Sequence, residues 1–236
     1  MALTGRLRGE YLLLPAAPTT GESSVINDIR AIVFDLDGTL YVNDELGRAI
    51  NQAAIRFIAQ LKGIEEKGAE ELLRETRQRL TAASSYDTPL SRVCMEVGGD
   101  LRKLHAYFTA EINPRPYLKR DERVVDLLKI LSTRFELYLY TNNNRALTEQ
   151  IVDILGLGRF FKKVVTIDNG WRPKPDQEAL MAVYRDINHA PDECIFVGDR
   201  YDVDLRLPAS VGSTVYRTKS VDELVNLLNI MNEEKL

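Results

Sequence analysis

The sequence predicts an α/β protein with a doubly wound, Rossmann-like parallel sheet as its core and a small all-helical insert. From Ala31 onward, short runs rich in β-branched and aromatic residues alternate with amphipathic stretches. Strands that alternate with helices of about 10–15 residues are typical of a parallel sheet covered on both faces. The stretch 44–112 breaks the alternation, because it contains helical patterns only.

Five apolar runs are predicted to form the strands. The first contains Ile32, Val33 and Phe34, which are β-branched or aromatic, as in a strand buried on both faces. The five runs are AIVF at 31–34, FELYLYT at 135–141, VVTI at 164–167, CIFVGD at 194–199 and STVYR at 213–217. Amphipathic stretches that predict helices lie at 124–131, 147–155, 180–187 and 221–230, and Gly156 ends the second of them.

The stretch 44–112 is predicted to form a separate helical domain, inserted into a core made of 29–43 and 113–236. Two apolar faces recur at helical spacing. They consist of Ile50, Ala54, Phe57, Ile58 and Leu61, and of Leu72, Leu73 and Leu80; helical patterns at 89–97 and 101–112 follow. Because the insert follows the first strand directly, we expect it above the sheet edge where that strand ends.

Residues 1–28 are predicted to form an N-terminal tail, either poorly ordered or docked on the core through a short segment. The tail contains prolines, threonines and serines without a sustained hydrophobic period. We do not expect a secretory signal, because Glu10 follows the arginines and only residues 11–14 are apolar before Pro15.

The composition favours an ordinary globular protein. Apolar residues make up 44% of the 236 residues, and the net charge is −4. The 31 basic residues are scattered rather than gathered in a stripe with aromatics, so nucleic acid is not an expected partner. No apolar run is long enough to span a membrane. Cys94 and Cys194 have no metal-ligand spacing and fit a reducing, cytoplasmic location.

Two carboxylates stand where the first strand ends. Residues i and i+2 of a strand point the same way, so Asp35 and Asp37 are expected to meet in one cleft, with Gly38 in the turn that follows. Like charges this close raise the pKa of one partner, and a bound cation or phosphate chemistry would account for them. A lone pair of this kind is also compatible with a simple polar turn.

Further polar residues follow the other predicted strands. Parallel strands bring their carboxyl ends to one crevice, where ligands bind. The residues at these ends are Thr141 and Asn142, Lys174 in WRPKP, and Asp199 with Asp202 and Asp204 just beyond. These residue types together suit phosphoryl transfer. A carboxylate can act as the nucleophile, a hydroxyl and backbone N–H groups can bind phosphate oxygens, a lysine can neutralise charge, and further carboxylates can hold Mg²⁺.

The chain resembles the haloacid dehalogenase superfamily of phosphohydrolases over about 29–228. DLDGT at 35–39, Thr141 in LYLYTNNN, Lys174 in RPKP and VGDRYDVD at 197–204 match the four family motifs in order and strand context. The helical stretch 44–112 resembles the family's C1-type cap. Within the superfamily, the chain is most similar to phosphoglycolate-phosphatase-like and pyrimidine-nucleotidase-like members.

The resemblance implies a role for each motif residue. Asp35 would be the nucleophile that becomes an aspartyl phosphate, and Asp37 the general acid and base. Mg²⁺ would be held by Asp35, the backbone carbonyl of Asp37, and Asp199. Asp204 fits the last acidic position of the fourth motif, whereas its rival Asp202 is expected to cap the following helix. The phosphate ligands would be Thr141, the N–H of Asn142, and Lys174, with Asn144 as the N-cap of the next helix.

The predicted function is a Mg²⁺-dependent phosphatase acting on a small phosphorylated metabolite. The family's dehalogenases lack the second acid, so Asp37 argues against halide chemistry. A phosphomutase of the β-phosphoglucomutase type carries the same four motifs and stays an alternative. A binding protein that retains the fold without catalysis is the third reading, disfavoured because every motif residue is present. The sequence indicates neither the substrate nor the oligomeric state.

Five other residues invite a functional interpretation without requiring one. The two histidines, His105 and His189, are expected to be surface or packing residues. Trp171 is expected at a partly buried core edge, with the mouth of the site as the second reading. Arg115 and Tyr117 lie in the proline-rich return from the insert, where they could form a hinge or, less expectedly, touch substrate.

Overall fold

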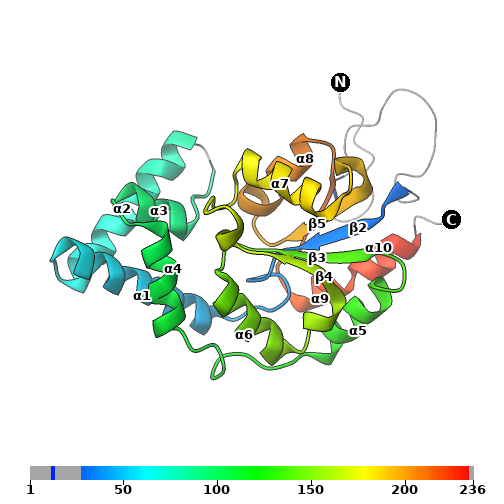
Figure 1. The fold of residues 1–236 in the computed structure, drawn as a ribbon, viewed down its shortest axis with the longest axis horizontal. Coiled ribbons are helices and arrows are strands. Elements are labelled where there is room, and N and C mark those ends of the chain that lie inside the picture. Colours follow the sequence, from blue (N-terminus) through cyan, green and yellow to red (C-terminus); the bar gives the residue numbers. More distant parts are fainter. Residues whose placement is uncertain (1–11, 14–27, 85, 234–236) are drawn as a thin grey trace.

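The computed structural model describes residues 12–13, 28–84 and 86–233, and it has the predicted α/β architecture (Figure 1). Six strands form one sheet in the order β1-β6-β5-β2-β3-β4. Five of them are parallel: β2 (Ala31–Phe34), β3 (Glu136–Tyr140), β4 (Phe161–Val165), β5 (Cys194–Gly198) and β6 (Thr214–Arg217). The carboxyl ends of these strands therefore meet at one edge.

Alternate residues of each strand pack into two separate layers. Ile32 and Phe34 of β2 pack with α5 (Glu122–Leu131), α6 (Arg145–Leu155), α9 (Val221–Val225) and α10 (Leu227–Glu233). Ala31 and Val33 face the opposite layer, which contains α7 (Gln177–Ile187) and α8 (Arg206–Ser210). Figure 1 shows the two sets of helices on opposite faces of the sheet. This is the double winding that the strand–helix alternation predicted.

Four helices follow β2 and lie beyond the carboxyl ends of the parallel strands (Figure 1). They are α1 (Asp44–Lys62), α2 (Glu66–Ser84), α3 (Leu90–Glu96) and α4 (Leu101–Glu111). The side chain of Asn43 caps α1 by accepting from the N–H of Leu46, and Gly63 ends it in the left-handed conformation. We refer to residues 44–112 as the helical unit.

Of the eight apolar residues expected on the two faces of the helical unit, four are buried and three are half-buried. Ala54, Phe57 and Ile58 of α1 are buried, as is Leu73 of α2. Leu61 is an exception, since 46% of it is exposed. It lies in the last turn of α1, next to the chain reversal at Gly63, where no neighbouring element is required to cover it.

The third parallel strand begins and ends earlier than expected. The sequence predicted 164–167, whereas β4 spans Phe161–Val165 and residues Ile167–Asn169 form a 3-10 turn, η3. Lys162 and Lys163 concealed the strand, because charged residues break an apolar run. They are tolerated since β4 is an edge strand, where the two lysines pair with Glu136 and Asp186.

Part of the N-terminal tail contacts the core. Leu12–Leu13 form β1, which pairs antiparallel with Val215 and Tyr216 of β6. The prediction for the other residues of 1–27 falls outside the described part of the chain. Among the described helices, none has both the length and the apolar character that crossing a bilayer would require.

Candidate active site

Asp35 stands at the centre of the carboxyl edge of the sheet. Its N–H donates to the carbonyl of Val197 at 2.8 Å, so Asp35 continues the pairing of β2 with β5. The carboxylate is buried; Oδ1 accepts from Lys174 Nζ at 2.7 Å and Oδ2 from Thr39 Oγ1 at 3.2 Å. Burial raises the pKa of Asp35 to about 7, against the opposing charge of Lys174.

Lys174 joins three elements through its ammonium group. Nζ lies 2.7 Å from Asp35 Oδ1, 2.7 Å from Asp204 Oδ1 and 2.9 Å from the carbonyl of Tyr140. Burial acts to lower the pKa of Lys174, but Asp204 and Asp35 together raise it above its ordinary value. The backbone of Lys174 is held by Asn142, whose Oδ1 accepts from the Lys174 N–H at 2.7 Å. Lys174 therefore stays charged in the buried site.

Asp37 has a different environment from Asp35, although it is only two residues away. Its Oδ1 accepts from the hydroxyl of Tyr41, and its Oδ2 accepts from Asn143 Nδ2 at 2.7 Å. Burial raises the pKa of Asp37, while the hydrogen bonds from Tyr41 and Asn143 oppose the rise. Two donors thus fix the orientation of this carboxylate.

Three carboxylates form a cluster suited to a metal ion. Asp35, Asp199 and Asp204 each offer an oxygen, and these oxygens lie within 4.8 Å of one another. Oδ1 of Asp199 is buried and accepts no hydrogen bond within the described part of the chain. Burial, followed by the charge of Asp204, raises the pKa of Asp199 to about 6. Hard oxygen ligands with an unsatisfied buried atom fit Mg²⁺.

Gly38 makes room for this cluster. Its φ is +81°, and a Cβ at this position would lie 2.6 Å from Asp199 Oδ2. Both the backbone conformation and the close approach of Asp199 therefore require glycine at residue 38.

Asp204, and not Asp202, belongs to the buried cluster. Both lie in a π-helical turn, η5 (Tyr201–Leu205), after β5. Asp204 is buried against Lys174, and its Oδ2 accepts from the N–H of Arg200 at 3.2 Å. Asp202 is half-buried and lies 3.8 Å from Arg206. The expectation that Asp202 caps the next helix is wrong, because Asp202 lies inside the turn and Arg200 precedes it.

The loop after β3 carries the predicted phosphate ligands. Thr141 is buried, and its Oγ1 accepts from the Asn143 N–H at 3.1 Å, which is compatible with donation of its hydroxyl hydrogen to a phosphate oxygen. Asn144 caps α6 as predicted, accepting from the N–H of Leu147 at 2.9 Å. The start of α6 thus lies next to Asn143, which contacts Asp37.

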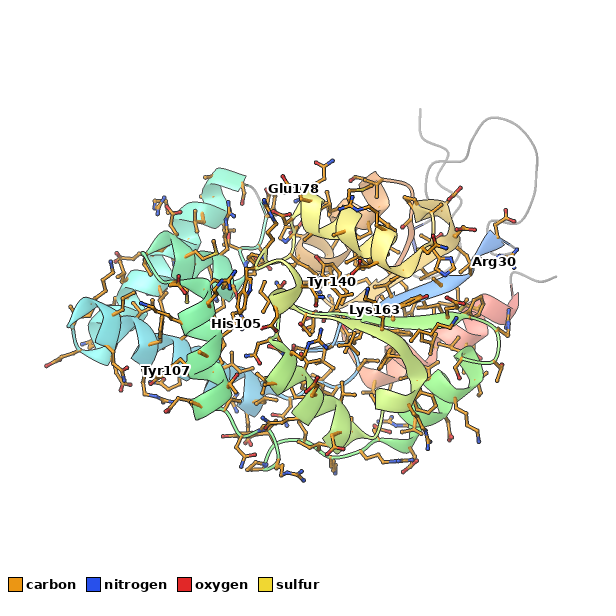
Figure 2. All side chains as sticks on the ribbon, in the orientation of Figure 1. Arg30, His105, Tyr107, Tyr140, Lys163 and Glu178 are labelled. Atoms are coloured by element: carbon orange, nitrogen blue, oxygen red, sulfur yellow. The ribbon has the colours of Figure 1, made fainter. Side chains whose placement is uncertain are left out.

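A cleft of about 860 Å³ lies between the helical unit and the edge of the sheet. Asp37, Asn142 and Asp199 line it, whereas Asp35 and Lys174 are buried beside it. His105 lines the opposite wall from α4; Figure 2 shows it on the side of α4 that faces the core. The helical unit therefore forms one wall of the cleft that contains the predicted site residues.

The residues for which the sequence did not require a functional role mostly have packing roles. His105 is buried and packs edge-to-face on Trp171, with 6.1 Å between ring centroids. His189 lies in a loop, 3.1 Å from Glu136. Trp171 is half-buried, and Arg102 lies over its ring. The carbonyl of Tyr117 accepts from Asn43 Nδ2 at 2.7 Å, which links the two connections to the helical unit.

Sequence reasoning missed three residues of the site. Tyr41 and Asn143 hold Asp37, and Arg200 lies 3.7 Å from Asp199 and 4.0 Å from Asp204. The three consecutive asparagines at 142–144 were the available signal for Asn143. Tyr41 had no comparable signal, because it reaches Asp37 only after the turn at Gly38 reverses the chain.

Known proteins resemble this chain in sequence and fold. A family model of haloacid dehalogenase-like hydrolases matches residues 29–212. The chain is 26% identical over 196 residues to the glyceraldehyde 3-phosphate phosphatase of Methanopyrus kandleri, covering 81% of this chain and 84% of that protein. It is 30% identical over 183 residues to phosphoglycolate phosphatase 1 of Pseudomonas aeruginosa, covering 74% of this chain and 64% of that protein.

The fold is similar to that of a HAD phosphatase from Thermococcus onnurineus, with a TM-score of 0.55, 20% identity, and coverage of 85% of this chain and 98% of that one. The family match extends over most of the chain and includes the strand ends that carry Asp35, Thr141, Lys174 and Asp199. The chain therefore belongs to the haloacid dehalogenase-like hydrolases.

Proposed function

We propose that the protein is a Mg²⁺-dependent phosphatase that hydrolyses a small phosphorylated metabolite through an aspartyl phosphate on Asp35. The observation that carries the proposal is the pairing of the Asp35 carboxylate with Lys174, beside two further carboxylates at the edge of the cleft. The phosphatase names of the relatives from Methanopyrus kandleri and Pseudomonas aeruginosa support the same reaction class.

The residues of the site have complementary roles in this reaction. A carboxylate oxygen of Asp35 attacks phosphorus, and the bond from phosphorus to the leaving oxygen breaks. Asp37 donates its proton to that oxygen. In the second step Asp37 takes a proton from water, the water oxygen attacks phosphorus, and Asp35 is released with inorganic phosphate. Tyr41 and Asn143 orient Asp37 for both proton transfers.

The charges of the site suit a phosphoryl group. Lys174 is positioned to neutralise a phosphate oxygen while it holds Asp35, and Thr141 to donate its hydroxyl. Asp35, Asp199 and Asp204 would hold Mg²⁺, with the predicted contribution of the Asp37 carbonyl. Bound Mg²⁺ would offset the negative charge of the carboxylates and of the phosphate.

We further propose that residues 44–112 act as the cap of this enzyme and select the leaving group. The support is their position on the far wall of the cleft from Asp37 and Asp199. The cytoplasmic location stays a prediction; both Cys94 and Cys194 are free and buried.

Substitution Asp35→Asn tests the nucleophile. We expect phosphate release to fall by on the order of a thousandfold or more, because a carboxamide is nearly isosteric but a poor nucleophile. Asp126→Asn, an exposed position on α5, is the matched control and should retain activity. Wild-type turnover by Asp35→Asn, with deamidation excluded by mass spectrometry, would refute the assignment.

Metal removal tests the cofactor. Released phosphate is measured for a panel of phosphorylated metabolites with Mg²⁺, with excess EDTA, and with Zn²⁺ alone. We expect activity with Mg²⁺ only, because the cluster contains carboxylates and no histidine or cysteine. Full activity in EDTA contradicts this. Transfer of phosphate back to a sugar, without release, would instead indicate the phosphomutase.

A further inference from the structure

The cleft is much larger than a phosphate group requires. Its volume is about 860 Å³, and of the proposed phosphate ligands only Asn142 lines it, on the sheet side. The remaining walls are formed by α1, α2, the loop between α2 and α3, α3, α4 and the segment after β6, and they are available to the leaving group of the substrate. The chemistry of these walls therefore bears on substrate class, and the inference below rests on the proposed function.

The described walls of the cleft are rich in positive charge. Apart from Asp37 and Asp199, which belong to the catalytic site, the acidic residues that line it are Asp44 and Asp87. The cationic residues that line it are Arg48, Arg77, Arg200, Arg217 and Lys219. Away from the catalytic residues, the walls of the cleft thus carry more cations than acidic residues, in a chain whose net charge is −4, as expected for a region that attracts an anion.

The cations lie on both sides of the cleft. Arg48 is in the first turns of α1 and Arg77 is in α2, so both belong to the helical unit. Arg217 ends β6, and its Nε donates to the carbonyl of Asp199 at 3.1 Å, which fixes it beside the catalytic carboxylates. Lys219 follows two residues later. An anion between these walls would be contacted from the core and from the helical unit.

Three of the cations form no ion pair within the described part of the chain. Within the described residues, Arg48, Arg77 and Lys219 have no ion-pair partner, whereas Arg79 on the same helix as Arg77 pairs with Glu96 at 2.8 Å. Asp44 lies four residues before Arg48 on α1, a spacing that commonly forms an ion pair, yet these two side chains do not pair. Their charges are therefore available to a ligand.

We propose that the natural substrate carries a second anionic group, a carboxylate or another phosphate, at the end of its leaving group. This group binds between Arg48 and Arg77 on one wall and Lys219 on the other. Arg217 then faces the middle of the substrate, between its two anionic groups. Because each exposed ion pair contributes little, discrimination comes from several cations acting on one anion in a partly enclosed cleft.

Matched ligands test this proposal. The phosphate ester of a short hydroxy acid is compared with that of the diol of equal length, in which a hydroxyl replaces the carboxylate. A diol bisphosphate compared with its monophosphate forms the second arm. Affinities are measured by calorimetry on the Asp35→Asn variant, so that the binding measurement does not depend on turnover. The value of kcat/KM is measured on the wild type.

In at least one pair, we expect the ligand with the second anionic group to have an affinity and a kcat/KM higher by on the order of tenfold. This preference should fall as salt is added. Arg48→Gln, Arg77→Gln and Lys219→Gln should each reduce that ratio several-fold. Arg92→Gln is the control, since Arg92 is an exposed arginine of α3 that does not line the cleft.

Equal affinity for both members of both pairs, or equal ratios in wild type and variants, overturns the proposal. The larger ratio identifies the anion as carboxylate or phosphate. A protein that shows the binding preference but releases no phosphate from any ester would retain this inference and lose the proposed function.

Discussion

At the scale of single residues, the neighbours of Asp35 and Asp37 separate the tasks of two carboxylates that lie two residues apart. Asp35 is paired with a cation, Lys174, whereas Asp37 accepts from two neutral donors, Tyr41 and Asn143. A cation favours the ionised, nucleophilic form of its partner against the effect of burial, while neutral donors orient a carboxyl group that must gain and lose a proton.

This difference makes Tyr41 a testable positioning residue. Loss of its hydroxyl in Tyr41→Phe removes an interaction that opposes the raised pKa of Asp37, so that pKa should rise further. We expect kcat to fall by about 10–100-fold, with little change in KM and a shift of the acidic limb of the kcat profile to higher pH.

Asn143→Ala should move the pH profile in the same direction, because it removes the second donor to Asp37. Tyr107→Phe is the control, since the Tyr107 hydroxyl contacts Gln60, away from the site. A lower kcat with an unmoved pH profile would reduce Tyr41 to a packing role.

At the scale of elements, α4 connects the helical unit to the core. Asn144 Nδ2, at the start of α6, donates to the carbonyl of His105 at 3.0 Å, and Thr109 Oγ1 donates to Asn144 Oδ1 at 3.2 Å. The ring of His105 is buried between Ser91, Phe108 and Trp171. Burial lowers the pKa of His105 to about 4, so His105 packs in its neutral form at neutral pH.

The buried histidine predicts a pH dependence of stability. Its ordinary pKa of about 6.5 in the unfolded chain lies above the folded value, so between these pH values the unfolded chain binds the extra proton. The free energy of unfolding should therefore fall as the pH drops from about 6.5 toward 4, by at most about 1.4 kcal/mol per pH unit from this group.

Denaturant unfolding of the wild type and of His105→Gln at several pH values checks this. The variant starts with lower stability at pH 7 because it loses packing, but it should lose less stability on acidification than the wild type does. Parallel curves for the two proteins would show that His105 does not carry the effect.

The elements also show what hydrophobic patterning can and cannot predict. β2 and β5 are central and buried on both faces, so their apolar runs predicted the bounds of both strands to within one residue. β4 is an edge strand with lysines in its interior, and its predicted position was shifted. The site divides in the same way: Asp35, Lys174, Asp199 and Asp204 follow from strand ends and motifs. Tyr41 and Asn143 depend on how two loops fold back on Asp37, and the run of asparagines at 142–144 marks one of these loops without indicating that contact.

At the scale of the whole molecule, two further groups of contacts, besides those of α4 with the start of α6, hold the helical unit against the core. One lies at the connections, where Asn43 bonds to the carbonyl of Tyr117 and prolines at 114 and 116 restrict the backbone. The other joins α8 to the loop between α2 and α3, where the Arg206 guanidinium sits 4.1 Å from the ring centroid of Tyr86. Substrate can enter a wider cleft if the second contact breaks while the first acts as the pivot.

The contact between Arg206 and Tyr86 should therefore bias the helical unit toward closure. Tyr86→Leu and Arg206→Gln each remove a cation–π interaction of about 0.5–2 kcal/mol, which favours the open form. We expect KM to rise about two- to thirtyfold and the radius of gyration from small-angle scattering to increase without ligand. Arg159→Gln removes a similar contact with Phe160 that lies wholly within the core, so it should change neither quantity. If Tyr86→Leu and Arg206→Gln scatter and bind substrate as the wild type does, the contact has no part in closure, and the helical unit is held by α4 and its connections alone.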